Sequence, residues 1–213
     1  MILILASALA LISESVVCDL TPQGHDIPQH GPTGFTVACP ADHEDAAAIQ
    51  SAAEAAIAAI ILPLPRPGRQ DGNPPPRLWA ASELTMQLGN GSWRPALAQP
   101  MVRAIPWVPR QAIQQGAAHM LCALAFTPDA SGVDQQPGVA CISDVSTDLV
   151  ERHQRASMTQ AASLWRFAPV PVPYCFNHQL LTSATPTYPA TRRRQPPPAI
   201  PDPDLLPNLC EAG

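Results

Sequence analysis

Three histidines lie close together in the N-terminal part of the chain, among several carboxylates. They are His25, His30 and His43. Imidazole and carboxylate groups are suitable ligands for zinc or copper, so these three residues are the candidate metal site of the sequence. Ala47 stands where the helical zinc-protease motif needs a second histidine, so that motif is not formed. The alternative interpretation is that all three are solvent-exposed loop histidines.

No local pattern of a nucleophilic enzyme is present. The Gly-x-Ser-x-Gly sequence of the nucleophile elbow does not occur. A Ser/His/Asp triad could still be assembled in space from Ser143 or Ser146, His119 or His153, and Asp144. No sequence feature selects these residues over others, so we predict no catalytic residue and favour a protein that is not an enzyme.

The chain contains no lysine, because all 12 of its basic residues are arginine. This excludes Schiff-base and pyridoxal-phosphate chemistry, which need a side-chain amine. It also excludes the phosphate-binding P-loop and the ion pair of protein kinases. We therefore predict no cofactor. The formal net charge of −5 gives no basic footprint for nucleic acid.

The six cysteines predict a disulfide framework. An even number of cysteines in an exported chain indicates three bridges, for which 15 pairings exist. The spacing is wide and no Cys-x-x-Cys occurs, which argues against a zinc ribbon or a thioredoxin-like site. Six unpaired thiols in a cytosolic protein are the alternative. The candidates are Cys18, Cys39, Cys122, Cys141, Cys175 and Cys210.

The N-terminus predicts a secreted or periplasmic protein. An almost unbroken apolar run over 1–12 is followed by Ser13 and Ser15, which suit cleavage by a signal peptidase after residue 15. The run is too short to span a bilayer, so we expect no stable transmembrane span. No Arg or Lys precedes it, and a buried N-terminal strand or helix is the alternative.

The composition favours one small domain held together by covalent bridges. Charged residues make up only 14% of the chain, aromatic residues 5%, and there are 27 prolines. The content of large apolar residues is near the lower edge for a packed core. Disulfides that close loops of tens of residues would offset this shortage by about 3–4 kcal/mol each.

Periodicity predicts a helix-rich α+β fold, with a signal peptide at 1–15 and one globular domain at 16–181. We expect a proline-rich linker at 63–76 and a disordered proline-rich tail at 182–213. Residues 19–34 read as loop, and 95–109 as short edge strands or irregular chain. No internal repeat is visible. Helices are predicted over 41–62, 110–126 and 148–167, and strands over 35–39 and 139–145.

Asn90-Gly91 predicts a β-hairpin after the alternating residues 84–88. Asn90 also begins the sequon Asn-Gly-Ser, which makes it a candidate N-glycosylation site. Charge is segregated along the chain, since residues 1–65 hold seven acids and no Arg, whereas residues 66–110 hold six Arg. The two parts could attract one another or present a polar surface to a partner, and solvated charge is the alternative.

Three functional hypotheses follow. The first is an exported, disulfide-stabilised protein that acts by binding or by structure, with an unknown protein as a possible partner. The second is a small secreted hydrolase, metal-assisted, with its site near the three histidines. The third is the translation product of a GC-rich reading frame that has no evolved biochemical function.

Overall fold

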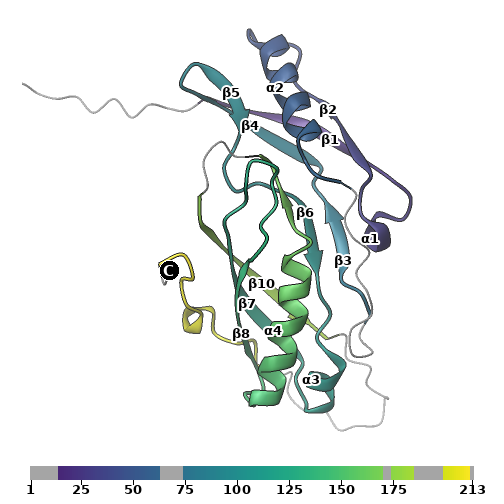
Figure 1. The fold of residues 1–213 in the computed structure, drawn as a ribbon, viewed down its shortest axis with the longest axis vertical. Helices are drawn as coiled ribbons and strands as arrows, with labels where there is room; N and C mark the ends of the chain where they lie inside the picture. The colour runs from purple at the N-terminus through teal and green to yellow at the C-terminus, as the bar shows by residue number, and fades with distance from the viewer. Residues whose placement is uncertain (1–13, 63–73, 170–173, 185–198, 212–213) are drawn as a thin grey trace, which may run out of the picture.

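The computed structural model describes residues 14–62, 74–169, 174–184 and 199–211 (Figure 1). Within these ranges ten strands form three antiparallel sheets, accompanied by four α-helices and one 3-10 turn. The protein is therefore β-rich, and the prediction of a helix-rich α+β fold is wrong.

The N-terminal sheet is a four-stranded antiparallel sheet covered by helix α2 (Ala46–Ala58). Its strands in spatial order are β2 (Gly34–Ala38), β1 (Ser15–Gln23), β4 (Glu83–Gly89) and β5 (Ser92–Pro95). The first half of β1 alternates strictly, with Val16, Cys18 and Leu20 buried and their neighbours exposed. This is the period-2 pattern of a strand with one face on the core. The helix contacts β2, β5 and β4.

The second large sheet has three strands, and helix α4 (Asp148–Ala162) packs against it. Its strands in spatial order are β10 (Phe176–Ser183), β7 (His119–Phe126) and β8 (Gly138–Ser143). Helix α4 begins at the N-cap Thr147, whose side chain accepts a hydrogen bond from the Val150 amide. An N-cap of this kind satisfies one of the unpaired amides of the first helical turn.

A small third sheet connects the two halves of the chain. It consists of β3 (Arg77–Ala80), β6 (Pro100–Ile105) and β9 (Arg166–Phe167), with β6 in the middle. Helix α4 also contacts β6, while the short helices α1 (Ile27–His30) and α3 (Arg110–Gln114) contact β3 and α4, respectively.

The two halves of the protein follow the same order of elements. Each begins with an antiparallel hairpin, continues through a helix and a short strand beside β6, and returns with a strand that pairs with the first strand of the hairpin. These elements are β1-β2-α2-β3-β4 in the first half, where the short helix α1 lies between β1 and β2, and β7-β8-α4-β9-β10 in the second. The repeat lies in the arrangement of elements and not in the sequence, where no repeat is visible.

All six cysteines are paired, which confirms the predicted disulfides, and each cysteine pairs with the next one along the chain. Cys18–Cys39 joins β1 to the residue after β2, and Cys122–Cys141 joins β7 to β8, so each half has one bridge across its hairpin. The third bridge, Cys175–Cys210, attaches the described part of the tail to the residue before β10.

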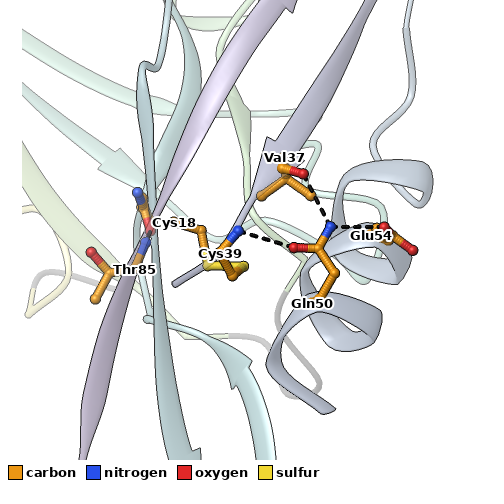
Figure 2. Close-up of a disulfide and its surroundings, with 7 residues drawn as sticks. Cys18, Val37, Cys39, Gln50, Glu54 and Thr85 are labelled. Carbon is orange, nitrogen blue, oxygen red and sulfur yellow. Dashed lines mark hydrogen bonds between the residues drawn. A yellow bond between two sulfur atoms is a disulfide. The ribbon is translucent and has the colours of Figure 1, made fainter. Parts of the chain in front are cut away.

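Gln50 of α2 lies beside the first bridge and hydrogen-bonds the backbone around Cys39 (Figure 2). Its side-chain oxygen accepts a hydrogen bond from the Cys39 amide at 2.9 Å, and its Nε2 donates to the Val37 carbonyl at 3.0 Å. Nε2 also donates to Glu54 Oε1 at 2.8 Å. One helical side chain thus fixes the end of β2 against the helix.

Each half has a buried cluster, and Phe35 and Leu62 pack against both. The larger cluster contains stacked rings, with Phe126 and Trp165 at a centroid distance of 5.0 Å and an interplanar angle of 23°. The buried indole of Trp165 donates to the Ala104 carbonyl on β6 at 3.0 Å. The second half is therefore anchored directly to the connecting sheet.

The predicted helix over 110–126 is the largest error within the fold. The structure has a five-residue helix that ends at Gln114, a turn with Gly116 at φ 95°, and then β7. All but the first residue of β7 are buried. A strand covered on both faces loses its alternation and cannot be told from a buried helix by periodicity alone.

Other segments predicted as loop or tail belong to strands. β1 extends to Gln23, into the start of the loop predicted over 19–34, and β10 extends to Ser183, past the start of the predicted tail. β6 is a central strand, although edge strands were expected for 95–109. The predicted helices over 41–62 and 148–167 are present but shorter, and the predicted β2, β8 and β4–β5 hairpin are confirmed.

The predicted signal peptide and linker fall largely outside the described residues. Residues 1–13 and 63–73 are among those not described. The fold already includes Glu14, whose carbonyl accepts a hydrogen bond from the Leu88 amide at 2.9 Å, and Ser15, which is in register with Gln87. The predicted cleavage after Ser15 would remove both residues. None of the helices in the described ranges combines the length and apolar character needed to cross a bilayer.

Candidate ligand-binding site

A cavity of about 570 Å³ lies between helix α1, strand β3 with the prolines that precede it, and the segment that follows β6. Nine residues line it, and they come from three separate parts of the described chain: Asp26, Pro28 and Gln29; Pro74, Pro75, Pro76, Arg77 and Trp79; and Trp107. A concave, mostly apolar site with a few polar groups is the usual form of a ligand pocket.

Strand β3 positions two of these side chains. Arg77 and Trp79 are exposed, whereas Leu78 between them is buried at 2% exposure. Alternate residues of a strand point to opposite faces, so Arg77 and Trp79 lie on the same outer face about 7 Å apart along the strand. Trp79 is 56% exposed, which is unusual for the largest apolar side chain.

Trp107 forms the other aromatic wall of the cavity. The Arg77 guanidinium carbon lies 4.3 Å from the centroid of the Trp107 ring, within the range of a cation–π contact. The Trp107 indole donates a hydrogen bond to the Pro75 carbonyl at 3.2 Å. Proline has a restricted backbone, so this bond and the three consecutive prolines fix one side of the cavity.

Helix α1 contributes a polar edge. Asp26 precedes the helix with φ 53°, a left-handed conformation that Asp tolerates better than most residues. Its carbonyl accepts hydrogen bonds from the amides of Gln29 and His30, while its carboxylate forms no ion pair with any described residue. A carboxylate, an amide and a guanidinium therefore surround a cavity whose other lining residues are Pro and Trp.

The cavity also brings together the acidic and basic parts of the sequence. Asp26 belongs to the acidic N-terminal part and Arg77 to the basic middle, and both line it. A second basic residue, Arg103, lies on the neighbouring strand, opposite Trp79 in the β3–β6 register. Across the described ranges no Arg–carboxylate ion pair is present at these positions, so the exposed charges remain accessible to a partner.

The three predicted metal ligands are not gathered into one group. His25 and His30 are exposed near α1, whereas His43 lies before α2 and is bonded elsewhere. Among the described residues no three His, Cys, Asp or Glu side chains converge in a way that could hold a metal. The zinc or copper site stays a prediction that this geometry does not support.

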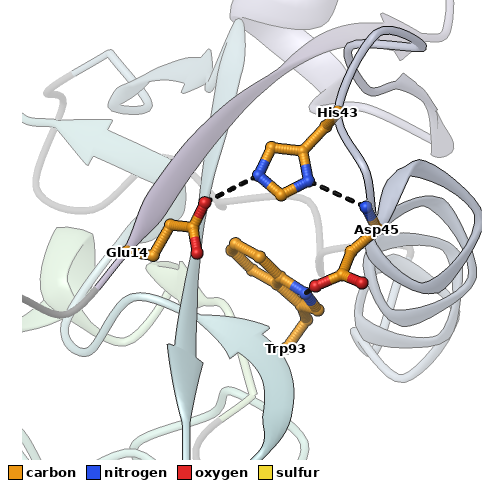
Figure 3. A network of polar contacts seen from close by, with 4 residues as sticks. All are labelled: Glu14, His43, Asp45 and Trp93. Atoms are coloured by element: carbon orange, nitrogen blue, oxygen red, sulfur yellow. Dashed lines mark hydrogen bonds and ion pairs between the residues drawn. The ribbon is translucent and has the colours of Figure 1, made fainter.

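His43 instead belongs to a polar network at the edge of the N-terminal sheet (Figure 3). Its Nδ1 accepts from the Asp45 amide at 3.0 Å, so the ring proton lies on Nε2, which donates to Glu14 Oε1 at 2.9 Å. The buried Trp93 packs edge-on against the imidazole and donates its indole N–H to Asp45 Oδ2 at 3.1 Å. This arrangement fixes the start of β1.

The residues considered for a catalytic triad are used structurally. Asp144 accepts hydrogen bonds from the amides of Ala118 and His119 and from the Ser143 hydroxyl, and among the described residues no hydrogen bond joins it to an imidazole. The His119 ring forms a hydrogen bond with Ser183, at 2.9 Å between Nδ1 and Oγ. Ser143 donates to the His119 carbonyl at 3.0 Å. The carboxylate, imidazole and hydroxyl therefore do not form a relay.

Ser146 and His153, the other residues considered for a triad, are also apart from one another. Ser146 donates to Glu151 at 2.9 Å. His153 lies within α4 and joins none of these contacts. Neither residue adds a nucleophile or a base to the site.

Asn90 lies at the exposed tip of the β4–β5 hairpin with φ 53°, followed by Gly91 at φ 74°. These angles match the two central positions of a type I′ turn, which confirms the predicted hairpin. An exposed turn gives a glycosyltransferase access to the side chain, and modification of Asn90 stays a prediction.

The sequence patterns do not single out Arg77, Trp79 or Trp107. The available signal is the short alternation of residues 77–80, which follows the three prolines at the end of the predicted linker. Comparison of the chain with models of protein families, with curated proteins and with solved structures finds no match. The site is therefore interpreted from its own chemistry.

Proposed function

We propose that this protein is an exported, disulfide-stabilised binding protein whose ligand site is the cavity beside Trp79. The observation that supports this most directly is the exposed Trp79 indole, held on a strand next to the Arg77–Trp107 contact. Exposed aromatic and Arg side chains are the groups that most often supply binding energy at protein surfaces.

Export is supported by the cysteines. All six are paired in three bridges, and disulfides persist in oxidising compartments outside the cytosol. The repeated order of elements, with one bridge across each hairpin, also supports a chain selected to fold. We expect a cooperative unfolding transition, whereas its absence would favour the product of an unselected reading frame.

A binding role is preferred to hydrolysis because the cavity contains no group arranged for proton transfer. Its titratable side chains are Asp26 and Arg77, and neither is paired with a nucleophile. The groups that it does present are rigid rings and hydrogen-bonding side chains, which suit recognition.

The test is a titration of the oxidised full-length protein, followed by intrinsic tryptophan fluorescence. The probes are proline-rich peptides, chitohexaose and cellohexaose, so that a peptide class and a saccharide class are both covered. We expect a saturable change with one class that is lost in Trp79→Ala. Tyr174→Ala is the matched control, because Tyr174 is 52% exposed and lies outside the cavity. No saturable change with any probe, or equal loss in both variants, contradicts the proposal.

A further inference from the structure

The lining of the cavity restricts the class of ligand that fits it. Four of its nine residues are Pro and two are Trp. We infer that the site takes an extended, proline-containing segment of a partner protein that carries a basic residue beside its prolines. This inference rests on the proposed binding function and names the ligand for that same site.

The protein already makes one contact of this kind within its own chain. The Pro75 carbonyl accepts the Trp107 indole N–H at 3.2 Å, and Arg77 stacks on the same ring. Aromatic-lined grooves bind proline-rich segments because a polyproline helix is preformed and loses little entropy on binding. Trp79 offers a second indole that makes no hydrogen bond with any described residue, so it is available to a partner's carbonyl.

Hydrogen-bond balance favours such a peptide over a saccharide. A proline residue has no N–H, so a buried proline segment needs donors for its carbonyls and few acceptors. The cavity offers donors in the Arg77 guanidinium, the Gln29 amide and the Trp79 indole. A sugar ring would bring several hydroxyl groups against walls of Pro and Trp, and buried hydroxyls without partners are costly.

The negative charge of Asp26 at the edge of the cavity is the reason to expect a basic residue in the partner segment. Asp26 is exposed, lines the cavity and forms no ion pair with any described residue. A partner Arg or Lys beside the prolines would pair with this carboxylate. An exposed pair of this kind adds modest affinity that salt screens, so it contributes mainly to selectivity.

The probe that tests this inference is a synthetic peptide with two runs of three prolines followed by two arginines. One control peptide has alanine in place of every proline, and a second has glutamine in place of each arginine. We expect saturable binding of the proline peptide to the oxidised full-length protein, and a loss of about tenfold or more in Trp79→Ala. Tyr174→Ala should bind the peptide as the wild-type protein does.

A second variant tests the charge. Asp26→Asn should lower the affinity for the arginine peptide severalfold and leave that for the glutamine peptide unchanged, so that the variant no longer distinguishes the two. The preference of the wild-type protein for the arginine peptide should also decrease with added salt.

The outcomes separate this inference from the function on which it rests. If chitohexaose or cellohexaose binds through Trp79 and the proline peptide does not, the ligand class is wrong and the binding function stands. Equal binding of the proline and alanine peptides also overturns the inference. If no probe binds, both proposals fail.

Discussion

Cys122 on β7 lies directly opposite Cys141 on β8, and a disulfide joins the two neighbouring strands. The bridge between Cys18 and Cys39 occupies the corresponding place in the first half, where it follows the β1–β2 register. Each half of the protein is thus closed across its own hairpin, at sequence separations of 19 and 21 residues.

The first prediction concerns these hairpin bridges. Replacing Cys122 and Cys141 together by alanine should lower the free energy of unfolding by about 3 kcal/mol, because a loop of this length gains that much chain entropy in the unfolded state. Urea unfolding followed by circular dichroism measures the change. A loss below about 1 kcal/mol would contradict the prediction.

The bridge between Cys175 and Cys210 provides the comparison. It joins residues 35 apart in the sequence, a larger separation than in either hairpin bridge. Its removal should nevertheless lower the free energy of unfolding by less than the removal of either hairpin bridge. The reason is that none of the described residues 199–211 belongs to either buried cluster, although the Leu209 amide donates a hydrogen bond to Asn177 of β10 at 3.2 Å. The tail can therefore detach while both cores stay folded.

The second prediction concerns the indole of Trp93. Trp93→Phe keeps an aromatic ring beside His43 but removes the donor to Asp45, and should lower the free energy of unfolding by about 1 kcal/mol. Thermal and urea unfolding both report it. Trp79→Phe is the matched control, since the Trp79 indole has no partner among the described residues. Equal effects at the two positions would refute the role of the hydrogen bond.

The third prediction is a pH dependence from His178 on β10. Burial lowers the pKa of His178, and the positive charge of Arg103 lowers it further. Between this lowered pKa and about 6.5, the value of an ordinary histidine, the unfolded chain binds a proton that the native protein does not. His178 therefore makes stability rise with pH through this window and fall as the pH drops below about 6.5.

Unfolding of the wild-type protein and His178→Gln at pH 5, 6, 7 and 8 tests this effect. We expect a smaller loss of stability on acidification in the variant. His25→Gln, at an exposed position in the other half, should keep the slope of the wild-type protein. An unchanged slope in His178→Gln would show that this imidazole does not cause the dependence.

The fourth prediction separates binding from folding on strand β3. Leu78→Ala should lower the free energy of unfolding by about 2–5 kcal/mol, because Leu78 is 2% exposed and packs in the larger core cluster. Trp79→Ala should change it by no more than about 0.5 kcal/mol, as expected for an exposed side chain. The reverse order of effects would mean that β3 presents its opposite face to solvent.

Local signals in the sequence predicted the local parts of this fold correctly. Asn90 and Gly91 both adopt positive φ angles, which the turn requires and which these two residue types favour. The β4–β5 hairpin could therefore be predicted from this dipeptide alone. Helices α2 and α4 lie within the ranges expected from helical periodicity. In α4 the N-cap is Thr147, immediately before the first residue of the predicted helix.

The remainder depends on contacts between distant segments. Residues 119–126 form a strand because β8 and β10 pair on its two sides, and β10 follows only after β8, α4 and β9 in the chain. The cavity depends on the same kind of contact, because α1 and β3 are brought together and Trp107 follows β6. No single segment of the sequence carries that information, so Trp79 could not be recognised as a site residue.

The repeated halves could not be seen in the sequence for a related reason. The equivalent helices differ in composition, since α2 is rich in alanine and α4 is largely polar. What the halves share is strand order and the position of a bridge. Six cysteines allow 15 pairings, and the choice among them follows from which strands become neighbours.

Disulfide mapping of the unreduced protein, isolated from its source and digested with trypsin, tests the division into two independently closed halves most directly. The chain has no lysine and no arginine before Arg66, so Cys18 and Cys39 stay on one fragment; Cys122 and Cys141 share the fragment between Arg110 and Arg152. We expect one covalent link between fragments, from Cys175 to Cys210. A link between a cysteine of the first half and one of the second, or six free thiols, would contradict this fold.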